Sequence, residues 1–227
     1  MLEGIWTQMS LSIEEEGRMG DKGHTAVTIS RQMGSGGTYI GYLLAREMGF
    51  KYIDREILRL AAKHLKTDAD WLENFDERSS GLLANILRGF ALGTPETTCT
   101  SPLNRPVYDR ELFTLECKIM NDMVDLHNAV IIGRAGFHAL RDRLGVVRVF
   151  IHAPVEFRIK RLMKVQNITD IRQARADIEK SDQRKAKFIR DMVSVSWTDS
   201  LNYHLCIDSS RVSFEASVEM IMKLVEE

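Results

Sequence analysis

The chain has 227 residues, which is enough for one domain of ordinary size with a sizeable buried core. Hydrophobic residues make up 44% and charged residues 28% of the sequence, which argues against disordered, collagen-like and disulfide-rich proteins. The formal net charge of -1 gives no overall electrostatic reason to bind nucleic acid or an anionic membrane, so any basic site must be local.

The predicted elements begin after an N-terminal extension, residues 1–23, which lacks a periodic apolar pattern. The β-branched run 24–30 predicts a strand, and the glycine cluster after it predicts a loop. Apolar residues at helical spacing predict a helix over 38–49 that stops at its terminal glycine. Strand, glycine loop and helix therefore follow one another directly.

The middle of the chain changes character. Residues 50–54 predict a second strand and 55–65 a helix that leaves it. Residues from about 66 to 110 are first acidic and then rich in Thr, Pro and Ser, which predicts a small helical insert with a flexible loop. Residues 111–127 are amphipathic and predict a further helix.

Short apolar runs of the kind found in buried parallel strands occur three more times. They are residues 129–134, 146–153 and 203–208. Strands that alternate with helices predict an α/β fold, with a parallel sheet covered by helices on both faces.

The cysteines and apolar segments indicate a reducing, aqueous compartment. Three cysteines without Cys-x-x-Cys spacing favour neither a disulfide framework nor a zinc site. No segment approaches the roughly 18 apolar residues of a membrane span, so we expect a soluble cytoplasmic protein without a membrane partner.

A basic stretch stands out in a chain that is close to neutral. Residues 158–190 contain eleven Lys or Arg against four acids. Such a stretch suits a polyanion, although a solvated helix face has the same appearance.

The loop from Arg31 to Thr38 is a candidate phosphate site. Small residues between a buried strand and a helix let backbone N–H groups approach phosphate oxygens, and the helix N-terminus adds positive potential. Compared with G-x-x-x-x-G-K-[ST], the loop keeps Gly36 and Thr38 but has Arg31 for the first glycine and Gly37 for the lysine. A structural tight turn is the alternative. A dinucleotide fingerprint fails at Tyr39 because it requires a small residue there.

Five segments, in order, resemble the cytidylate kinase-like family, a branch of the P-loop nucleoside monophosphate kinases. They are ISRQMGSGGTYIGYLLAREMGFKYIDREIL, AVIIGRAGFHAL, VFIHAPVEFRIKRL, IEKSDQRKAKF and NYHLCIDSSRVSFEASVEMI. The resemblance implies a three-layer P-loop kinase fold over residues 24–227, with a five-stranded parallel sheet in the order 2-3-1-4-5. It also implies a helical acceptor-binding insert at about 66–110 and an arginine-rich lid at about 158–190.

The resemblance also implies roles for individual residues, with ATP and Mg²⁺ as cofactors. The residues expected to bind ATP are Gly34, Ser35, Gly36, Gly37, Thr38, Tyr39 and Ser209. Thr38 is also the expected Mg²⁺ ligand. The residues expected to bind the acceptor are Asp54, Arg55, Arg134 and Asp182. The expected catalytic arginines are Arg31, Arg158, Arg161 and Arg184. Phosphoryl transfer suits such a set, because guanidinium groups neutralise the charge that spreads over the transferred group.

Two departures from the family pattern leave the acceptor open. Cytidylate kinases proper have Asp-Gly-Arg-Asp where this chain has Ile-Gly-Arg-Ala at 132–135. The missing lysine calls for another cation, for which Arg31 is the first candidate and Arg134 the second. For Arg31, a strand-end salt bridge is the alternative.

The leading hypothesis is an enzyme that phosphorylates a nucleoside monophosphate, with CMP the first acceptor to try. A nucleotide- or phosphometabolite-binding module with little turnover is the second hypothesis. A nucleic-acid binder that uses the basic stretch is the third, and a homo-oligomer stays open.

Overall fold

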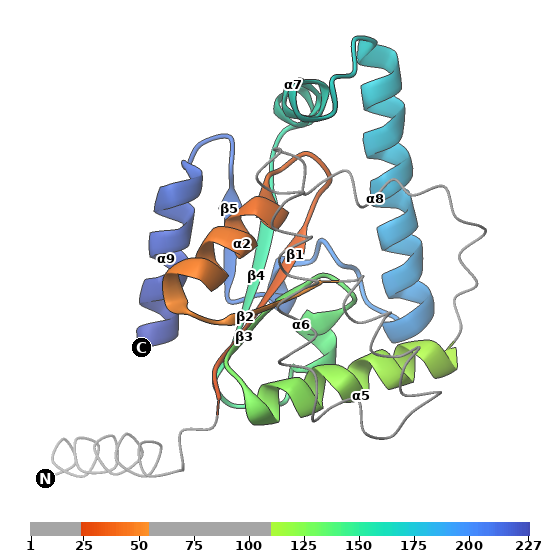
Figure 1. Cartoon of the computed structure of the whole chain (residues 1–227). Coiled ribbons are helices and arrows are strands. Elements are labelled where there is room, and N and C mark those ends of the chain that lie inside the picture. The colour runs from red at the N-terminus through yellow and green to blue at the C-terminus, as the bar shows by residue number, and fades with distance from the viewer. Residues whose placement is uncertain (1–23, 55–109) are drawn as a thin grey trace, which may run out of the picture.

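The structure is a computed structural model that describes residues 24–54 and 110–227 (Figure 1). The predicted extension at 1–23 and nearly all of the predicted insert lie outside these residues, as does Arg55.

The five predicted strands are all present and form one parallel sheet in the order β2-β3-β1-β4-β5, as the resemblance implied. Their bounds are Ala26–Arg31 for β1, Lys51–Ile53 for β2, Ala129–Ile132 for β3, Val146–His152 for β4 and Leu205–Asp208 for β5. The central strand β1 pairs with β3 from Ala26 to Ile29 and with β4 along its whole length. Because the strands are parallel, the loops that follow them meet at one edge of the sheet.

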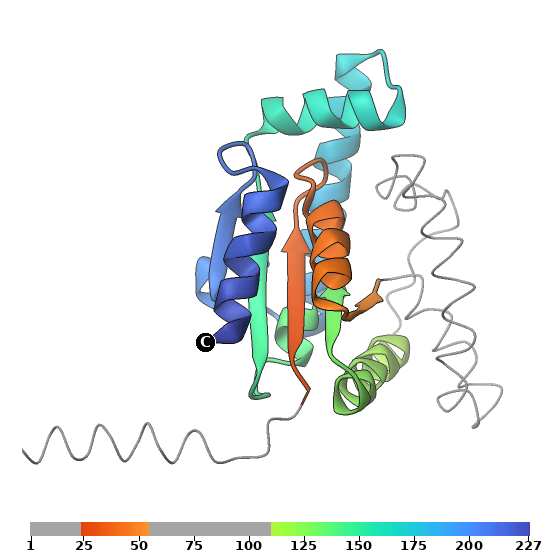
Figure 2. The same ribbon diagram turned by 60° about the vertical axis from the view of Figure 1, so that its left-hand side comes forward.

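Helices cover both faces of this sheet (Figures 1 and 2). Their bounds are Gly37–Met48 for α2, Arg110–Leu126 for α5, Gly136–Ala139 for α6, Val155–Gln166 for α7, Ile171–Val193 for α8 and Phe214–Glu226 for α9. A 3-10 turn, η3, covers Ser200–Asn202. Helices α2 and α9 lie on one face, and α5 and α6 on the other (Figure 2).

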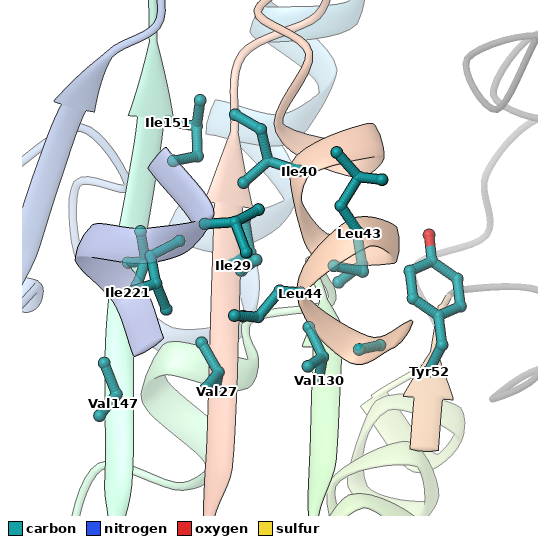
Figure 3. Close-up of a cluster of buried hydrophobic side chains, with 14 of the residues drawn as sticks. Val27, Ile29, Ile40, Leu43, Leu44, Tyr52, Val130, Val147, Ile151 and Ile221 are labelled. Carbon is teal, nitrogen blue, oxygen red and sulfur yellow. The ribbon is translucent and has the colours of Figure 1, made fainter. Parts of the chain in front are cut away.

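A buried apolar core packs helix α2 against the sheet. Leu44 and Ile40 pack against Ile29 and the neighbouring strand residues (Figure 3). From α9, Ile221 packs in the same cluster. Burying such aliphatic side chains contributes about 1.5–3 kcal/mol each. The helix ends at Met48, one residue before the predicted end, and its C-cap Gly49 has φ 66°, in the left-handed region that glycine favours.

Helices α7 and α8 form an arm over the residue range of the predicted lid. Helix α7 and the start of α8 lie beyond the carboxyl ends of the strands, and α8 then runs back along the sheet toward α5 (Figures 1 and 2). Their own apolar cluster includes Ile159, Leu162, Ala174 and Ile178, and it takes in Met33 from the glycine loop. The arm therefore packs directly on the loop after β1. Within residues 24–54 and 110–227, no helix is long and apolar enough to cross a bilayer.

Candidate functional site

The loop between β1 and α2 has the backbone of a phosphate cradle. Gly34 and Gly36 have φ 80° and 82°, in the left-handed region that favours glycine. Gly36 is also the N-cap of α2 and makes no side-chain capping bond. Because the first N–H groups of a helix have no acceptor inside it, the start of α2 presents donors to an anion.

Close packing on two sides also requires glycine here. A Cβ on Gly34 would lie 2.7 Å from the carbonyl oxygen of Arg158. A Cβ on Gly36 would lie 2.5 Å from the ring of Phe214 and 3.3 Å from Nε of Arg161. The loop is therefore enclosed by α7 and by the start of α9.

Arg31, the last residue of β1, extends its side chain over this loop. Its Nε donates a hydrogen bond to Oγ1 of Thr38 at 3.1 Å, which joins the two residues that the sequence singled out at either end of the loop. A Cβ on Gly37 would lie 2.5 Å from Cβ of Arg31. Within the described part of the chain Arg31 has no carboxylate partner. The structure there contains a hydrogen bond to Thr38 in place of the strand-end salt bridge considered as the alternative.

Arg158 on α7 and Asp182 on α8 hold the glycine loop from the side of the arm. Arg158 is buried, and its Nη1 donates to Oδ2 of Asp182 at 2.6 Å and to the carbonyl oxygen of Met33 at 3.3 Å. The backbone N–H of Met33 donates to Oδ1 of Asp182 at 3.2 Å. Both backbone groups of Met33 are thus bound by one ion pair between α7 and α8.

The turn after β5 holds the loop from the opposite side. The hydroxyl of Ser209 donates to the carbonyl oxygen of Ser35 at 2.6 Å and approaches that of His152 at 3.2 Å. In the same turn, the hydroxyl and N–H of Ser210 donate to Asp208 at 2.7 and 2.9 Å. The hydroxyl of Ser210 is the main reason why the pKa of Asp208 is lowered.

Arg161 lies one helical turn after Arg158 and faces aromatic residues beside the loop. Its guanidinium carbon is 4.8 Å from the ring centroid of Phe214, a cation–π distance. Tyr39 meets the same ring edge-on at 5.9 Å. An arginine and two aromatic rings therefore border the glycine loop.

Arg134 follows β3 at the same edge of the sheet. Its Nε donates to Oε2 of Glu116 at 2.8 Å and its Nη2 contacts the same oxygen, while its guanidinium carbon lies 4.6 Å from the ring centroid of Phe188. The Glu116 side chain is fully buried in α5. Gly133, Arg134 and Ala135 have φ 74°, 49° and 55°. Consecutive left-handed residues are costly outside glycine, and such strain gathers at functional sites.

The remaining predicted site residues divide into three groups. Asp54 is half-buried directly after β2, at the same edge of the sheet as the glycine loop. Arg184 is exposed on α8. Arg55 lies outside the described residues. The acceptor-binding roles of Asp54 and Arg55 and the catalytic role of Arg184 stay predictions.

The start of α2 offers one oxygen ligand of a kind that fits Mg²⁺. Thr38 is buried at the start of α2, and its hydroxyl has a second lone pair beside the one that accepts from Arg31. The described residues contain no cluster of three His, Cys, Asp or Glu able to hold a metal. Mg²⁺ commonly keeps few protein ligands and relies on substrate phosphates, so Thr38 fits as one ligand.

Sequence reasoning missed Glu116, Met33 and Phe214. Glu116 had a signal, because it lies at helical spacing between Leu112 and Ile119 on the apolar stripe of α5. A carboxylate on a buried stripe calls for a cationic partner. Met33 and Phe214 meet the loop only through tertiary packing, so no local pattern identifies them.

Solved structures with a similar fold include an uncharacterized protein from Eubacterium ventriosum ATCC 27560, at 18% identity and a TM-score of 0.66, with 90% of this chain and 99% of that chain covered. A shikimate kinase from Bacteroides thetaiotaomicron aligns at 15% identity and a TM-score of 0.47, covering 89% and 99%. A gluconokinase from Sinorhizobium meliloti 1021 aligns at 13% identity and a TM-score of 0.46, covering 91% and 96%. At 18% identity, the similarity to the first of these structures shows a shared fold and says nothing of function.

A comparison with curated proteins finds no match. The profile of the cytidylate kinase-like family, in contrast, matches residues 26–211, a range that contains the glycine loop, the turn after β3 and the whole arm. Together with the sheet order expected of P-loop kinases, this match shows that the chain belongs to the cytidylate kinase-like family.

Proposed function

We propose that the protein transfers the terminal phosphoryl group of ATP, with Mg²⁺, to a nucleoside monophosphate or a similar small phosphorylated acceptor. The observation that supports this most is the loop itself. Arg31, Thr38 and the donor end of α2 come together beneath an arginine-bearing arm, in a chain of the cytidylate kinase-like family. CMP is the first acceptor to test, by family analogy only.

In this proposal the loop binds the ATP phosphates through backbone N–H groups at the start of α2. Thr38 would hold the metal ion, which supplies charge neutralisation for the phosphate oxygens. Arg161 and the rings of Tyr39 and Phe214 offer flat and cationic surfaces for the base, with Ser209 fixing the loop carbonyl beneath them. The residues of the chain therefore act mainly by positioning and by charge.

The acceptor phosphate would bind at the turn after β3. Arg134 presents a guanidinium there, and Asp54 follows the neighbouring strand β2 at the same edge. Glu116 orients Arg134 from below through Nε and Nη2. An oriented guanidinium of this kind suits the binding of phosphate oxygens.

A second candidate function is a nucleotide- or phosphometabolite-binding module with little turnover. Two observations favour it. Gly37 replaces the lysine of the motif, and Arg158 and Arg134 each contact a carboxylate of the protein itself. A binding module needs only some of its arginines to reach the ligand, whereas a kinase needs several to meet on one phosphoryl group.

The experiment that separates them measures ADP formation from ATP and Mg²⁺ across CMP, UMP, AMP and GMP. Thr38→Val serves as the disabled variant because it keeps the shape and removes the hydroxyl. Thr114→Val is its matched control, since Thr114 is exposed on α5 and, within the described residues, donates only to the carbonyl of Arg110. Gly36 is a poor choice, because any Cβ there meets the Phe214 ring.

Turnover with one acceptor that is lost in Thr38→Val and kept in Thr114→Val would establish the kinase and name its acceptor. Saturable ATP binding without turnover on any acceptor would favour the binding module. Turnover that survives Thr38→Val unchanged would contradict the role given to the loop.

A further inference from the structure

Compared with the phosphate motif, this chain has its cationic residue and one of its glycines at swapped positions. In G-x-x-x-x-G-K-[ST], a glycine begins the loop and a lysine precedes the hydroxyl residue. Here the cationic residue, Arg31, begins the loop, and glycine, Gly37, precedes Thr38. The loop therefore keeps one cation and one glycine, at opposite positions.

The packing of the loop explains why both changes occur together. A Cβ on Gly37 would lie 2.5 Å from Cβ of Arg31, 3.1 Å from its Cγ and 3.0 Å from Cβ of Ile151. Real Cβ atoms essentially never approach others so closely. Consequently position 37 has no room for a lysine while Arg31 occupies its observed position.

The guanidinium of Arg31 lies where a phosphate cation is needed. Its Nε donates to Oγ1 of Thr38, the expected metal ligand, at 3.1 Å. Its Nη1 occupies the space that a Cβ on Gly133 would need, and Gly133 has φ 74°. The charge thus sits between the start of α2 and the turn that carries Arg134.

The charge of Arg31 is also not neutralised by an acid in the described part of the chain, where Thr38 is its hydrogen-bond partner. Arg158 differs, because its Nη1 is 2.6 Å from Asp182. A half-buried guanidinium with N–H groups to spare binds phosphate oxygens in pairs.

We propose that Arg31 is the phosphate-binding cation of this loop and takes the place of the missing lysine, with Gly37 and Gly133 providing its space. This inference rests on the proposed function, since it concerns the phosphates that the loop would bind. It assigns the loop a ligand class, polyphosphate, that can be tested without any acceptor.

The first test measures binding of inorganic tripolyphosphate by calorimetry, with and without Mg²⁺, and of ATP in parallel. Arg31→Gln is expected to weaken tripolyphosphate binding about 10- to 100-fold, which corresponds to the loss of a charge-assisted hydrogen bond. Arg31→Lys should retain most of the affinity, because it keeps the charge. Arg148→Gln, on the neighbouring strand β4 and bound to His204, is the matched control and should bind as the native chain does.

The second test exchanges the two residues. Gly37→Lys alone should bind poorly, because its side chain meets Arg31, and Arg31→Gly alone should lose the cation. The double variant Arg31→Gly with Gly37→Lys restores the standard motif and should regain tripolyphosphate affinity relative to both single variants. Circular dichroism and the unfolding midpoint check that each variant folds. If Arg31→Gly does not fold, the comparison of Arg31→Gln with Arg31→Lys still tests whether the charge at position 31 binds tripolyphosphate.

Unchanged affinity in Arg31→Gln, or a double variant that binds no better than Arg31→Gly, would overturn the inference. Tripolyphosphate binding that depends on Arg31, without turnover on any acceptor, would support the inference while the proposed function fails. A native chain that binds neither tripolyphosphate nor ATP would overturn both.

Discussion

The ion pair between Arg158 and Asp182 joins the arm to the glycine loop, and Asp182→Asn tests how much this joint contributes. The substitution removes the charge but keeps the shape. One carboxylate oxygen accepts from Arg158 at 2.6 Å and the other from the N–H of Met33 at 3.2 Å. An Asn amide can satisfy only one of them, because its NH₂ group faces the other donor.

The magnitude follows from burial. The side chains of Arg158 and Asp182 are 9% and 19% exposed. Breaking a fully buried ion pair costs about 3–5 kcal/mol, and the partial exposure of Asp182 lowers this to about 2–3 kcal/mol. Urea denaturation followed by circular dichroism should report that loss. Hydrogen exchange at the Met33 amide should accelerate, since its acceptor is removed.

The matched control lies on the same helix. Asp191 pairs with Lys187 at 2.7 Å, but these side chains are 35% and 65% exposed. Asp191→Asn should cost no more than about 0.5 kcal/mol, as exposed helical pairs do. If Asp182→Asn destabilises the protein no more than Asp191→Asn, and Met33 exchange is unchanged, the arm is not held through this pair.

Three further predictions concern the other ionisable groups. Glu116→Gln, which removes the buried partner charge of Arg134, should lower the unfolding free energy by about 2–4 kcal/mol in urea denaturation, and a loss below about 0.5 kcal/mol would contradict the buried pairing. Burial raises the pKa of the Cys117 thiol to about 11, so iodoacetamide at pH 8 should modify it about 100-fold more slowly than in the urea-unfolded chain; equal rates would refute this. Burial and the charge of Arg148 lower the pKa of His204. The neutral imidazole therefore stabilises the folded protein fully above the ordinary histidine pKa, and this contribution is lost as the pH falls through the lowered pKa. An NMR titration should find this pKa below the ordinary value, and Arg148→Gln should raise it; no change would exclude the charge effect.

The fold was predictable because its signals are local. Buried parallel strands appear as short apolar runs, and all five such runs are strands at nearly the predicted bounds. The end of α2 at Gly49 follows from the left-handed conformation that glycine favours. The sheet order came from the resemblance, because strand spacing alone does not specify which strands are neighbours.

The site was predictable only where it is one continuous segment. Because residues 31–38 form one continuous segment, comparison with the phosphate motif singled out Arg31 and Thr38, which the structure joins by a hydrogen bond. The contact between Asp182 and Met33 joins residues 149 positions apart in the chain, and nothing near either residue encodes it. Glu116 lies between these cases, since its position on the apolar stripe is visible but its partner is not.

The structure gives different surroundings to the arginines that the resemblance listed together as catalytic. Arg158 already binds Asp182 and the carbonyl of Met33 in a buried place, so drawing it onto a phosphate would leave a largely buried carboxylate without its main counter-charge. Its observed contacts therefore hold the arm on the loop. Arg31 and Arg161, in contrast, border the glycines themselves, one beside Thr38 and the other within 3.3 Å of a Cβ on Gly36. Under the proposed function, we therefore expect Arg31 at the end of β1 to be the first phosphate-binding arginine and Arg161 to be the second.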